Sequence, residues 1–367
     1  MNNKVFGIAV HYPQNTNREQ VYFGNTTNYI RDLIEEANKK NWTGFVFSPQ
    51  DVLRRRGVVW GFVRSSGIWR RSFLPIPSVC YLQIGMLSDS DREILNWMSA
   101  EMSTQYINSP HVVDILSDRW RSLQIMISHP TLVTKVVETN LYKGARDLGD
   151  QINDEENGLC IYPRFRSNNS FMEIKKTGKS FRVREYSGKT IKSSRLKTLD
   201  EIDNRIIGLF GEAIVQPKIK TFNIDGYPIV IRTYWQKDVI WSNSLTVLRI
   251  GQKESYGRLA TIGAIDDHKN LFAKKFKSFS ESILYQIESV SKACAELLEQ
   301  RTHGIHEITV DYLLTTHGNL LLYDVNHHGI ETAVKVANPE VKHNLIQKTL
   351  RNAEIIYKNS HIDRFTV

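Results

Sequence analysis

The chain has few cysteines and no long apolar run, and each shortage excludes a class of protein. Its cysteines, Cys80, Cys160 and Cys294, are scattered along 367 residues, with no Cys-x-x-Cys pair and no cluster of cysteine with histidine. This pattern argues against a disulfide scaffold or a zinc site and favours a reducing compartment. No window reaches 18 apolar residues, and the first residues hold too short an apolar stretch for a signal peptide. We therefore expect a cytoplasmic protein that does not span a membrane.

The composition is that of a globular protein with an excess of positive charge. Apolar residues make up 41% of the chain and aromatic residues 10%, which is enough for a sizeable core. The length favours about two domains. Lysine and arginine outnumber aspartate and glutamate by 48 to 39, which gives a net charge of +9. A basic protein attracts anions, so phosphates, carboxylate substrates, nucleic acid and anionic lipid all stay open as partners.

The hydrophobic pattern predicts a mixed α/β chain. Strand-like runs at 4–10 and 43–49 enclose a helical pattern at 27–40, which is the order of a small domain with parallel strands. Strand-like segments with glycine turns fill the middle of the chain. The other main elements expected are helical segments over 89–140, 272–298 and about 338–357, and a hairpin over 306–326.

Two aspartates in the last hairpin are the main candidates for a binding site. If a two-residue turn is centred on His317 and Gly318, Asp311 lies directly opposite Asp324. Asn326 then points to the same face, because side chains alternate along a strand. Two carboxylates so placed repel each other by roughly 4 kcal/mol at about 4 Å and an effective dielectric of roughly 20. A shared proton, a lysine or arginine partner, or Mg²⁺ or Mn²⁺ would relieve the repulsion, unless the hairpin face is simply solvated.

Short motifs spread along most of the chain occur in a family's order. They are FSPQDV (47–52), WRRSFLPIPSVCY (69–81), DRW (118–120), HPTLV (129–133), VQPKI (215–219), GYPIVIRTYWQKD (226–238) and the closing VDYLL…GNLLLYDVN. Together they resemble the YheC/YheD family of endospore coat-associated ATP-grasp proteins. The resemblance implies an α/β (α+β) chain with the ATP-grasp fold behind an N-terminal Rossmann-like pre-ATP-grasp domain. The implied units are the N-terminal domain over 1–125, an ATP-grasp central subdomain over 126–214 and a C-terminal subdomain with the metal site over 215–367.

The resemblance also implies an ATP-dependent ligase. Such an enzyme uses Mg-ATP to turn a carboxylate into an acyl phosphate, and an amine or other nucleophile then displaces phosphate, which forms an amide or related bond. By the resemblance, Asp311, Asp324 and Asn326 hold Mg²⁺ or Mn²⁺. Arg232, in the VIRTY strand, and Arg249, in VLRIG, are the implied catalytic cations, facing the phosphates or the acyl phosphate. Either arginine could instead be a structural partner of a carboxylate.

The implied hinge between the ATP-grasp subdomains is the segment VQPKI. There the backbone of Val215 and Gln216 would pair with the adenine edge, and apolar neighbours, with Ile219 among them, would sandwich the ring. Gln216 before Pro217 could equally mark the end of a strand, since proline cannot continue a central ladder.

The phosphate-binding end departs from the family. Tyr162 stands where the family has a lysine, and a phenol carries no positive charge at neutral pH. The loop that follows, FRSNNSFM at 165–172, has no glycine to let the backbone approach a phosphate closely. Arg164, which we group with Tyr162 as a nucleotide-binding candidate, or Arg166 could replace the missing cation.

The metal end departs less. Asp324 is shorter than the family's glutamate, so the backbone must bring it nearer to any cation. His327 and His328 stand where the family has Lys-Pro, and we interpret them as an exposed pair rather than as metal ligands or bases.

Three kinds of function therefore stay open. The first is a ligase that joins an anionic carboxylate, a small acid or a peptide, to a nucleophile. The second is a catalytically degenerate protein of the same fold that serves as a binding or spore-coat component. The third is a nucleic-acid binder, suggested by the basic, tryptophan-containing stretch 54–71, although that stretch fits no base-reading module. A homo-oligomer is compatible with the resemblance.

Overall fold

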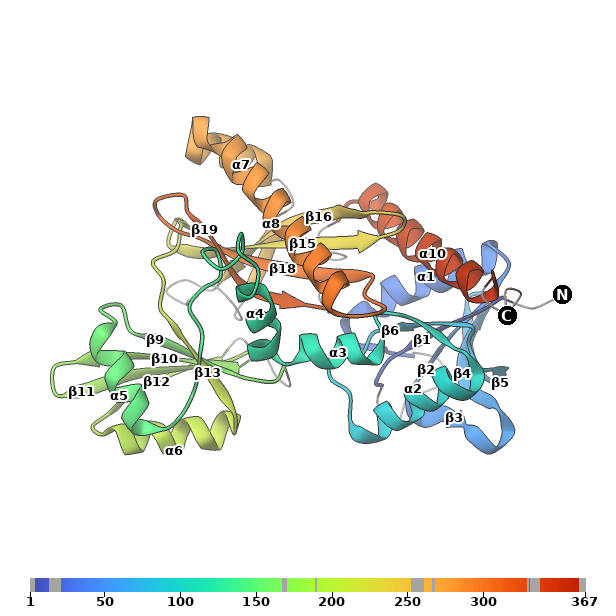
Figure 1. Ribbon diagram of the computed structural model, residues 1–367, viewed down its shortest axis with the longest axis horizontal. Coiled ribbons are helices and arrows are strands. Elements are labelled where there is room, and N and C mark those ends of the chain that lie inside the picture. Colours follow the sequence, from blue (N-terminus) through green and yellow to red (C-terminus); the bar gives the residue numbers. More distant parts are fainter. Residues whose placement is uncertain are drawn as a thin grey trace.

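Three β-sheets and the helices that cover them make up the computed structural model of the chain (Figure 1). The prediction of a mixed α/β fold is therefore confirmed. The structure describes residues 4–12, 21–166, 170–188, 190–251, 261–265, 268–328, 330 and 337–362. None of the helices in these ranges is long and apolar enough to cross a membrane.

The first sheet contains β1 (Lys4–Ala9), β2 (Trp42–Phe47), β3 (Val52–Leu53), β4 (Val58–Ser65), β5 (Ile68–Pro75), β6 (Val79–Leu82) and β7 (Gln105–Ile107). Its order is β3-β4-β2-β1-β6-β7, with β5 paired to β4. β1 runs parallel to β2 on one side and to β6 on the other. The order of strands in the sheet therefore reverses at β1, and open α/β sheets bind ligands at such switch points, outside the carboxyl ends of the strands.

Helices cover both faces of this sheet. α1 (Thr27–Lys39) and α10 (Pro339–Ile362) pack on one face, and α2 (Asp89–Met102) and part of α3 (Pro110–Ser117) pack on the other. α1 forms because its apolar residues recur at helical spacing on one side; Ile30, Leu33, Ile34 and Ala37 are all fully buried. The C-terminal helix thus returns to the N-terminal sheet (Figure 1).

The second sheet contains β8 (Asn140–Leu141), β9 (Leu159–Pro163), β10 (Ser170–Thr177), β11 (Ser180–Ser187), β12 (Thr190–Leu196) and β13 (Ala213–Pro217). Its order is β12-β11-β10-β9-β13-β8, and every neighbouring pair is antiparallel. α5 (Ala145–Asp154) and α6 (Leu199–Phe210) cover one face. Residues 214 and 215 both lie in β13, although the expected subdomain boundary falls between them, and the division into domains stays a prediction.

The third sheet contains β14 (Asn223–Ile224), β15 (Tyr227–Lys237), β16 (Trp241–Gly251), β17 (Thr261–Ile265), β18 (Glu307–Leu314) and β19 (Leu320–Asn326). Its order is β17-β16-β15-β18-β19, with β14 paired to β15. α4 (Arg119–Ile127) and α8 (Ser280–Arg301) cover one face. The opposite face meets the uncovered face of the second sheet, where Tyr162 and Phe171 share a buried cluster with Leu313 and Tyr323.

Two helix predictions were wrong in detail. The single helix expected over 272–298 is broken into α7 (His268–Phe276) and α8 by a 3₁₀ turn at Lys277–Phe279. Lys277 takes a φ of +44°, which no α-helix continues through, so the apolar stripe does not run on across the break. Phe279, expected on the buried stripe, is 71% exposed. The helical region expected over 89–140 also contains the short strand β7.

A buried carboxylate joins the first sheet, the third sheet and α10. Oε2 of Glu307 accepts hydrogen bonds from the hydroxyls of Tyr81 and Tyr234, both at 2.7 Å. Oε1 accepts from Gln236 at 2.8 Å and from Thr349 at 3.0 Å. Burial raises the pKa of Glu307, and these four hydrogen bonds lower it only in part. The proton affinity of this carboxyl group is thereby linked to the packing of the two sheets.

We expect Glu307→Gln to gain stability relative to the wild type as the pH rises. Because the folded-state pKa of Glu307 lies above the ordinary value of 4.5, its contribution to stability is present below that pH and is lost as the pH rises through the folded-state pKa. A glutamine does not titrate, so the free energy of unfolding of the variant minus that of the wild type should increase as the pH rises above 4.5 and through the folded-state pKa of Glu307. Urea unfolding at several pH values measures this difference, and a value independent of pH would contradict the expectation.

Candidate functional site

The two aspartates of the last hairpin face each other as predicted. Asp311 of β18 is paired in register with Asp324 of β19, and Thr309 is paired with Asn326. Both aspartates are 1% exposed. The alternative of a solvated hairpin face is therefore excluded, and the two carboxylates lie inside the protein.

This register arises from two irregularities that offset each other. The turn spans three residues rather than the two expected, since Thr315 donates its N–H to the carbonyl of Asn319 at 2.9 Å. Gly318 supplies the left-handed conformation that closes the turn, with a φ of +83°. A β-bulge follows between Asp311 and Tyr312, and it shifts the pairing by one residue. The predicted two-residue turn was wrong, but the bulge restores the predicted pairing of the aspartates.

Asp311 is neutralised by an arginine from the neighbouring strand. Arg232 of β15 is its register partner, and the guanidinium donates from Nε to Oδ1 and from Nη2 to Oδ2, both at 2.6 Å. Arg249 of β16 places Nη1 3.8 Å from Oδ2 of the same carboxylate. Burial alone would lower the pKa of Arg232, but the charge and hydrogen bonds of Asp311 raise it above its ordinary value. Both predicted catalytic arginines therefore lie at the aspartate pair.

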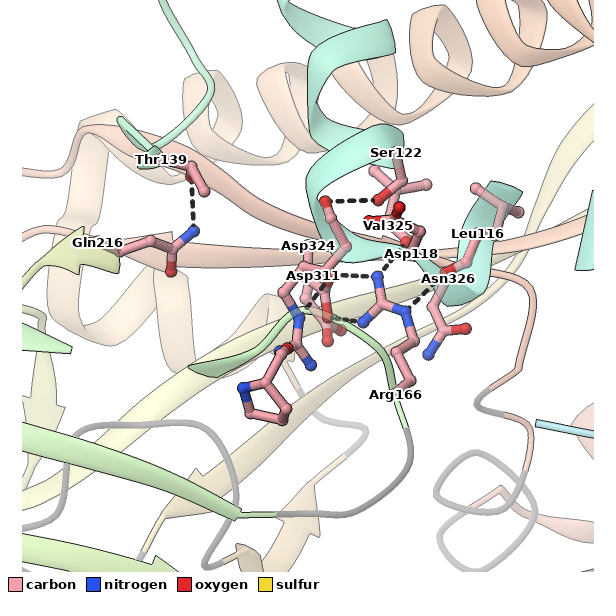
Figure 2. A network of polar contacts seen from close by, with 12 residues as sticks. Leu116, Asp118, Ser122, Thr139, Arg166, Gln216, Asp311, Asp324, Val325 and Asn326 are labelled. Carbon is pink, nitrogen blue, oxygen red and sulfur yellow. Dashed lines mark hydrogen bonds and ion pairs between the residues drawn. The ribbon is translucent and has the colours of Figure 1, made fainter. Parts of the chain in front are cut away.

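Asp324 is neutralised by an arginine that follows β9 of the second sheet. Arg166 donates from Nη1 to Oδ2 at 2.6 Å and from Nη2 to Oδ1 at 2.5 Å (Figure 2). The same guanidinium also donates to the carbonyls of Val325, at 2.6 Å, and Leu116, at 2.7 Å. Arg119, at the start of α4, places Nε 3.8 Å from Oδ1 of Asp324. Each aspartate thus has one bidentate arginine and a second arginine nearby.

We call these six residues the arginine–aspartate cluster: Arg119, Arg166, Arg232, Arg249, Asp311 and Asp324. None of the six side chains is more than 11% exposed. Four positive and two negative groups give the cluster a formal charge of +2. An excess of positive charge held away from water favours binding of an anion, and guanidinium groups match phosphate and carboxylate oxygens.

The carboxylate oxygens of the cluster and the nearby side chain of Asn326 are of the chemical type that binds a divalent cation. Two carboxylates and the amide oxygen of Asn326 are the hard ligands that Mg²⁺ and Mn²⁺ prefer. Asn326 Oδ1 accepts one hydrogen bond, from the N–H of His328 at 3.0 Å, and keeps a second lone pair. In the described ranges no three side chains of histidine, cysteine, aspartate or glutamate form a metal cluster. The donor set fits Mg²⁺ if a guanidinium withdraws from one carboxylate.

Tyr162 lies in a stack of aromatic rings beside the cluster. It is 1% exposed, and its ring centroid is 5.5 Å from that of Phe171, which stacks on Tyr186 at 4.1 Å. Arg119 places its Cζ 5.4 Å from the centre of the Tyr162 ring. The position at which the family has a lysine is therefore apolar here, with an arginine of α4 over its face.

Arg164 and Arg166 point to different partners. Arg164 makes a bidentate pair with Asp118, with Nη2 to Oδ2 at 2.7 Å, and reaches Glu212 at 2.7 Å. These two carboxylates hold Arg164 outside the cluster, whereas Arg166 enters it. Of the two replacement cations considered from the sequence, the geometry favours Arg166.

The predicted hinge residues lie to one side of the cluster. In β13, Val215 is paired with Asn140 of β8, and Gln216 is buried with Nε2 donating to Oγ1 of Thr139 at 2.9 Å (Figure 2). Ile219 packs against the buried cluster between the second and third sheets. Their role in holding adenine stays a prediction.

Two residues of the site were not expected there from the sequence. Arg119 stands in the DRW motif, which carried no assigned role, and only the fold brings it to Asp324. His327 was expected in an exposed pair but is 3% exposed, and its Nε2 contacts the carbonyl of Ile84, just beyond β6, at 3.1 Å. Burial, with the charge of His328, lowers the pKa of His327 to about 3, so the imidazole is neutral. His327, which follows the end of β19, therefore contacts the first sheet at its switch point, just beyond β6.

Three of the six arginines in the basic stretch 54–71 pair with carboxylates that lie close to this stretch in the sequence. These internal pairs favour a solvated protein face over a surface that tracks nucleic acid, which needs unpaired cations. The pairs are Arg54 with Glu93 at 2.9 Å, Arg64 with Glu35 at 2.6 Å and Arg71 with Asp51 at 2.5 Å.

Comparison with known proteins gives matches over most of the chain. Residues 106–356 match the family described as YheC/D like ATP-grasp. The endospore coat-associated protein YheC of Bacillus subtilis (strain 168) is 22% identical over 334 residues, which cover 86% of this chain and 87% of that protein.

Solved ligases share the fold. The VanG D-Ala:D-Ser ligase from Enterococcus faecalis superposes with a TM-score of 0.58 at 10% identity, over 97% of this chain and 100% of that one. The ATP-grasp ligase PsnB, solved with its minimal precursor, Mg and ADP, gives a TM-score of 0.53 at 12% identity, over 96% of this chain and 99% of that one. At such low identity the likeness shows the fold alone, and the predicted ATP-grasp fold is confirmed.

Proposed function

Because the chain belongs to the YheC/D-like ATP-grasp family, we propose that it is an ATP-dependent ligase that joins a carboxylate to an amine or another nucleophile. The observation that carries the proposal is the arginine–aspartate cluster. It gathers four guanidinium groups and two carboxylates at the meeting of the second and third sheets. Phosphoryl transfer depends on fixed charges of this kind more than on covalent help from the protein.

In the proposed complex, the nucleotide's phosphates lie at the cluster. Asp311, Asp324 and Asn326 hold Mg²⁺ or Mn²⁺, which neutralises part of the phosphate charge when bound. Arg232 and Arg249 face the transferring group from the third sheet. The adenine lies between the second and third sheets, with the backbone of Val215 and Gln216 at its edge and Ile219 against the ring.

The proposed reaction has two steps. A carboxylate oxygen of the substrate attacks the γ-phosphorus of ATP, the bond to the bridging oxygen of ADP breaks, and an acyl phosphate forms. The nucleophile then attacks the acyl carbon, the bond to the phosphate oxygen breaks, and the nucleophile gives up its proton. A small acid or a peptide fits this chemistry, and the neighbour PsnB was solved with a precursor bound.

We place the second substrate at the switch point of the first sheet. His327, which follows Asn326, touches Ile84, so the carboxyl ends of β1 and β6 lie next to the cluster. Gln83 is 8% exposed, and its Oε1 has no hydrogen-bond partner among the described residues. A buried amide oxygen of this kind is suited to accept a hydrogen bond from an amine nucleophile.

Calorimetry with ATP tests the proposal. We expect ATP to bind in the presence of Mg²⁺ or Mn²⁺, and Arg249→Gln to weaken this binding about tenfold or more because a buried cation is lost. Arg205→Gln is the matched control, since Arg205 is 50% exposed and pairs only with Glu185 among the contacts described. Absence of binding at millimolar ATP with either metal would contradict the proposal.

A non-catalytic binding or coat protein of the same fold is the second candidate. The apolar setting of Tyr162 favours it, because no lysine stands there to grip a phosphate. The name of YheC, an endospore coat-associated protein, agrees with such a role. For either function we propose a cytoplasmic site of action, which is supported by the three cysteines, all free and buried.

A further inference from the structure

Arg166 occupies the position on Asp324 that a metal ion would need. Both carboxylate oxygens accept hydrogen bonds from this one guanidinium. Two further N–H groups donate to the carbonyls of Val325 and Leu116, so two contacts to the aspartate and two to backbone carbonyls hold the side chain in place (Figure 2). A cation and Arg166 cannot both hold the same two oxygen atoms in this way.

The two bidentate pairs of the cluster differ in how they are built. Arg232 and Asp311 are register partners on adjacent strands of one sheet, so the sheet itself holds them together. Arg166 follows β9 in the second sheet and reaches across to β19 in the third. Arg166 itself lies outside any strand. Strand pairing therefore does not hold Arg166 opposite its aspartate, as it holds Arg232 opposite Asp311.

We propose that Arg166 is an exchangeable counter-ion for Asp324. It neutralises the carboxylate when no cation is bound there, and it moves to the nucleotide's phosphates when a divalent cation takes the carboxylate. This inference rests on the proposed function. It assigns to Arg166 the positive charge that Tyr162 cannot supply.

The exchange is favoured because neither group can be left alone. Asp324 is 1% exposed, and a buried carboxylate without a partner is strongly unfavourable. A guanidinium released beside bound polyphosphate finds oxygen acceptors of the geometry it prefers. Arg119, 3.8 Å from Asp324, stays beside the carboxylate in either state. Asp324 and Arg166 thus each keep a partner of opposite charge before and after the exchange.

The test is one substitution that should raise the affinity for Mn²⁺ and lower the affinity for ATP. For Arg166→Gln we expect Mn²⁺ to bind about tenfold or more tightly without nucleotide, because the competing guanidinium is gone. With Mn²⁺ saturating, we expect the same variant to bind ATP about tenfold or more weakly, because a phosphate cation is gone. Electron paramagnetic resonance of free Mn²⁺ gives the first affinity, and calorimetry gives the second.

Arg205→Gln is the matched control. Arg205 of α6 also makes a bidentate pair, but with Glu185 and outside the arginine–aspartate cluster, so neither affinity should change more than about twofold. If Arg166→Gln does not fold, Arg166→Lys keeps the charge without the bidentate geometry and should show both changes to a smaller extent.

The outcomes separate this inference from the proposed function. Mn²⁺ binding that is unchanged or weaker in the variant overturns the exchange, and so does an unchanged affinity for ATP. If the wild-type protein itself binds no ATP with Mn²⁺, the proposed function fails, and the transfer to phosphate fails with it. Tighter Mn²⁺ binding together with weaker ATP binding supports the exchange.

Discussion

Asp311→Asn is expected to lower the free energy of unfolding by about 3–5 kcal/mol, the range found when one partner of a buried ion pair is removed. Asp311 is 1% exposed and accepts two hydrogen bonds of 2.6 Å from Arg232. An asparagine keeps the size of the side chain but removes the charge and turns one acceptor into a donor that faces the guanidinium. The buried Arg232 would lose its counter-charge inside the third sheet. Urea unfolding followed by tryptophan fluorescence measures the loss.

A double variant separates loss of the pair from loss of packing. Arg232→Met with Asp311→Leu removes both charges and keeps apolar volume, and it should recover most of the stability, since a buried ion pair is often no better than an apolar one. As a surface control, Glu93→Gln breaks the pair with Arg54, in which Glu93 is 71% and Arg54 34% exposed, and should cost at most about 1 kcal/mol. A loss below about 1 kcal/mol for Asp311→Asn would show that Arg232 does not depend on this carboxylate.

The aspartate pair could be predicted from local pattern because it depends on alternation and on one turn. The turn and the bulge each differ from the simple hairpin by one residue, and the two differences cancel between Asp311 and Asp324. The residue left unpaired by the bulge is Tyr323 of β19, and a buried tyrosine is ordinary in any strand, so the sequence could not reveal the bulge. The predicted register is therefore correct at Asp311 and Asp324 but wrong between these residues and the turn.

The partners of the aspartates could not be predicted in the same way. Arg166 is 158 residues from Asp324 in the sequence, and its position depends on how the second sheet packs against the third. Arg119 and His327 likewise reach the site through contacts between sheets and helices rather than through periodicity. A lysine or arginine partner was one of the expected ways to relieve the repulsion between the carboxylates, but the sequence does not show which residue supplies it.

The break between α7 and α8 shows the limit of periodicity. Apolar residues continue at helical spacing across the break, yet Lys277 adopts a left-handed conformation and Phe279 turns outward. Phe276 instead packs on Phe222, with ring centroids 4.7 Å apart. Packing against a segment that is distant in the sequence overrides the helical pattern there.

Asp324→Asn is expected to lower Mg²⁺-dependent ATP binding about tenfold or more, and to lower ADP formation with the carboxylate substrate about 10²- to 10³-fold. The substitution removes one of the two proposed metal carboxylates and leaves only a neutral amide. The fold should tolerate it better than Asp311→Asn, because Arg166 retains the carbonyls of Val325 and Leu116 as acceptors. Calorimetry and an ADP assay measure the two effects, and thermal unfolding checks the fold.

The matched control for this experiment is Asp114→Asn. Asp114 of α3 accepts the Nε–H of Arg92 on both carboxylate oxygens, each at 3.0 Å, and lies outside the arginine–aspartate cluster. The Asp114→Asn substitution should leave ATP binding and ADP formation unchanged. If Asp324→Asn also leaves both unchanged while the protein stays folded, the acid pair does not serve the nucleotide, and the non-catalytic candidate explains the family resemblance better. If Asp324→Asn loses ATP binding and ADP formation while Asp114→Asn keeps them, the charge of the Asp324 carboxylate serves the nucleotide site. The side chain has nearly the same shape in the wild type and in Asp324→Asn, so a change of shape does not explain such a loss.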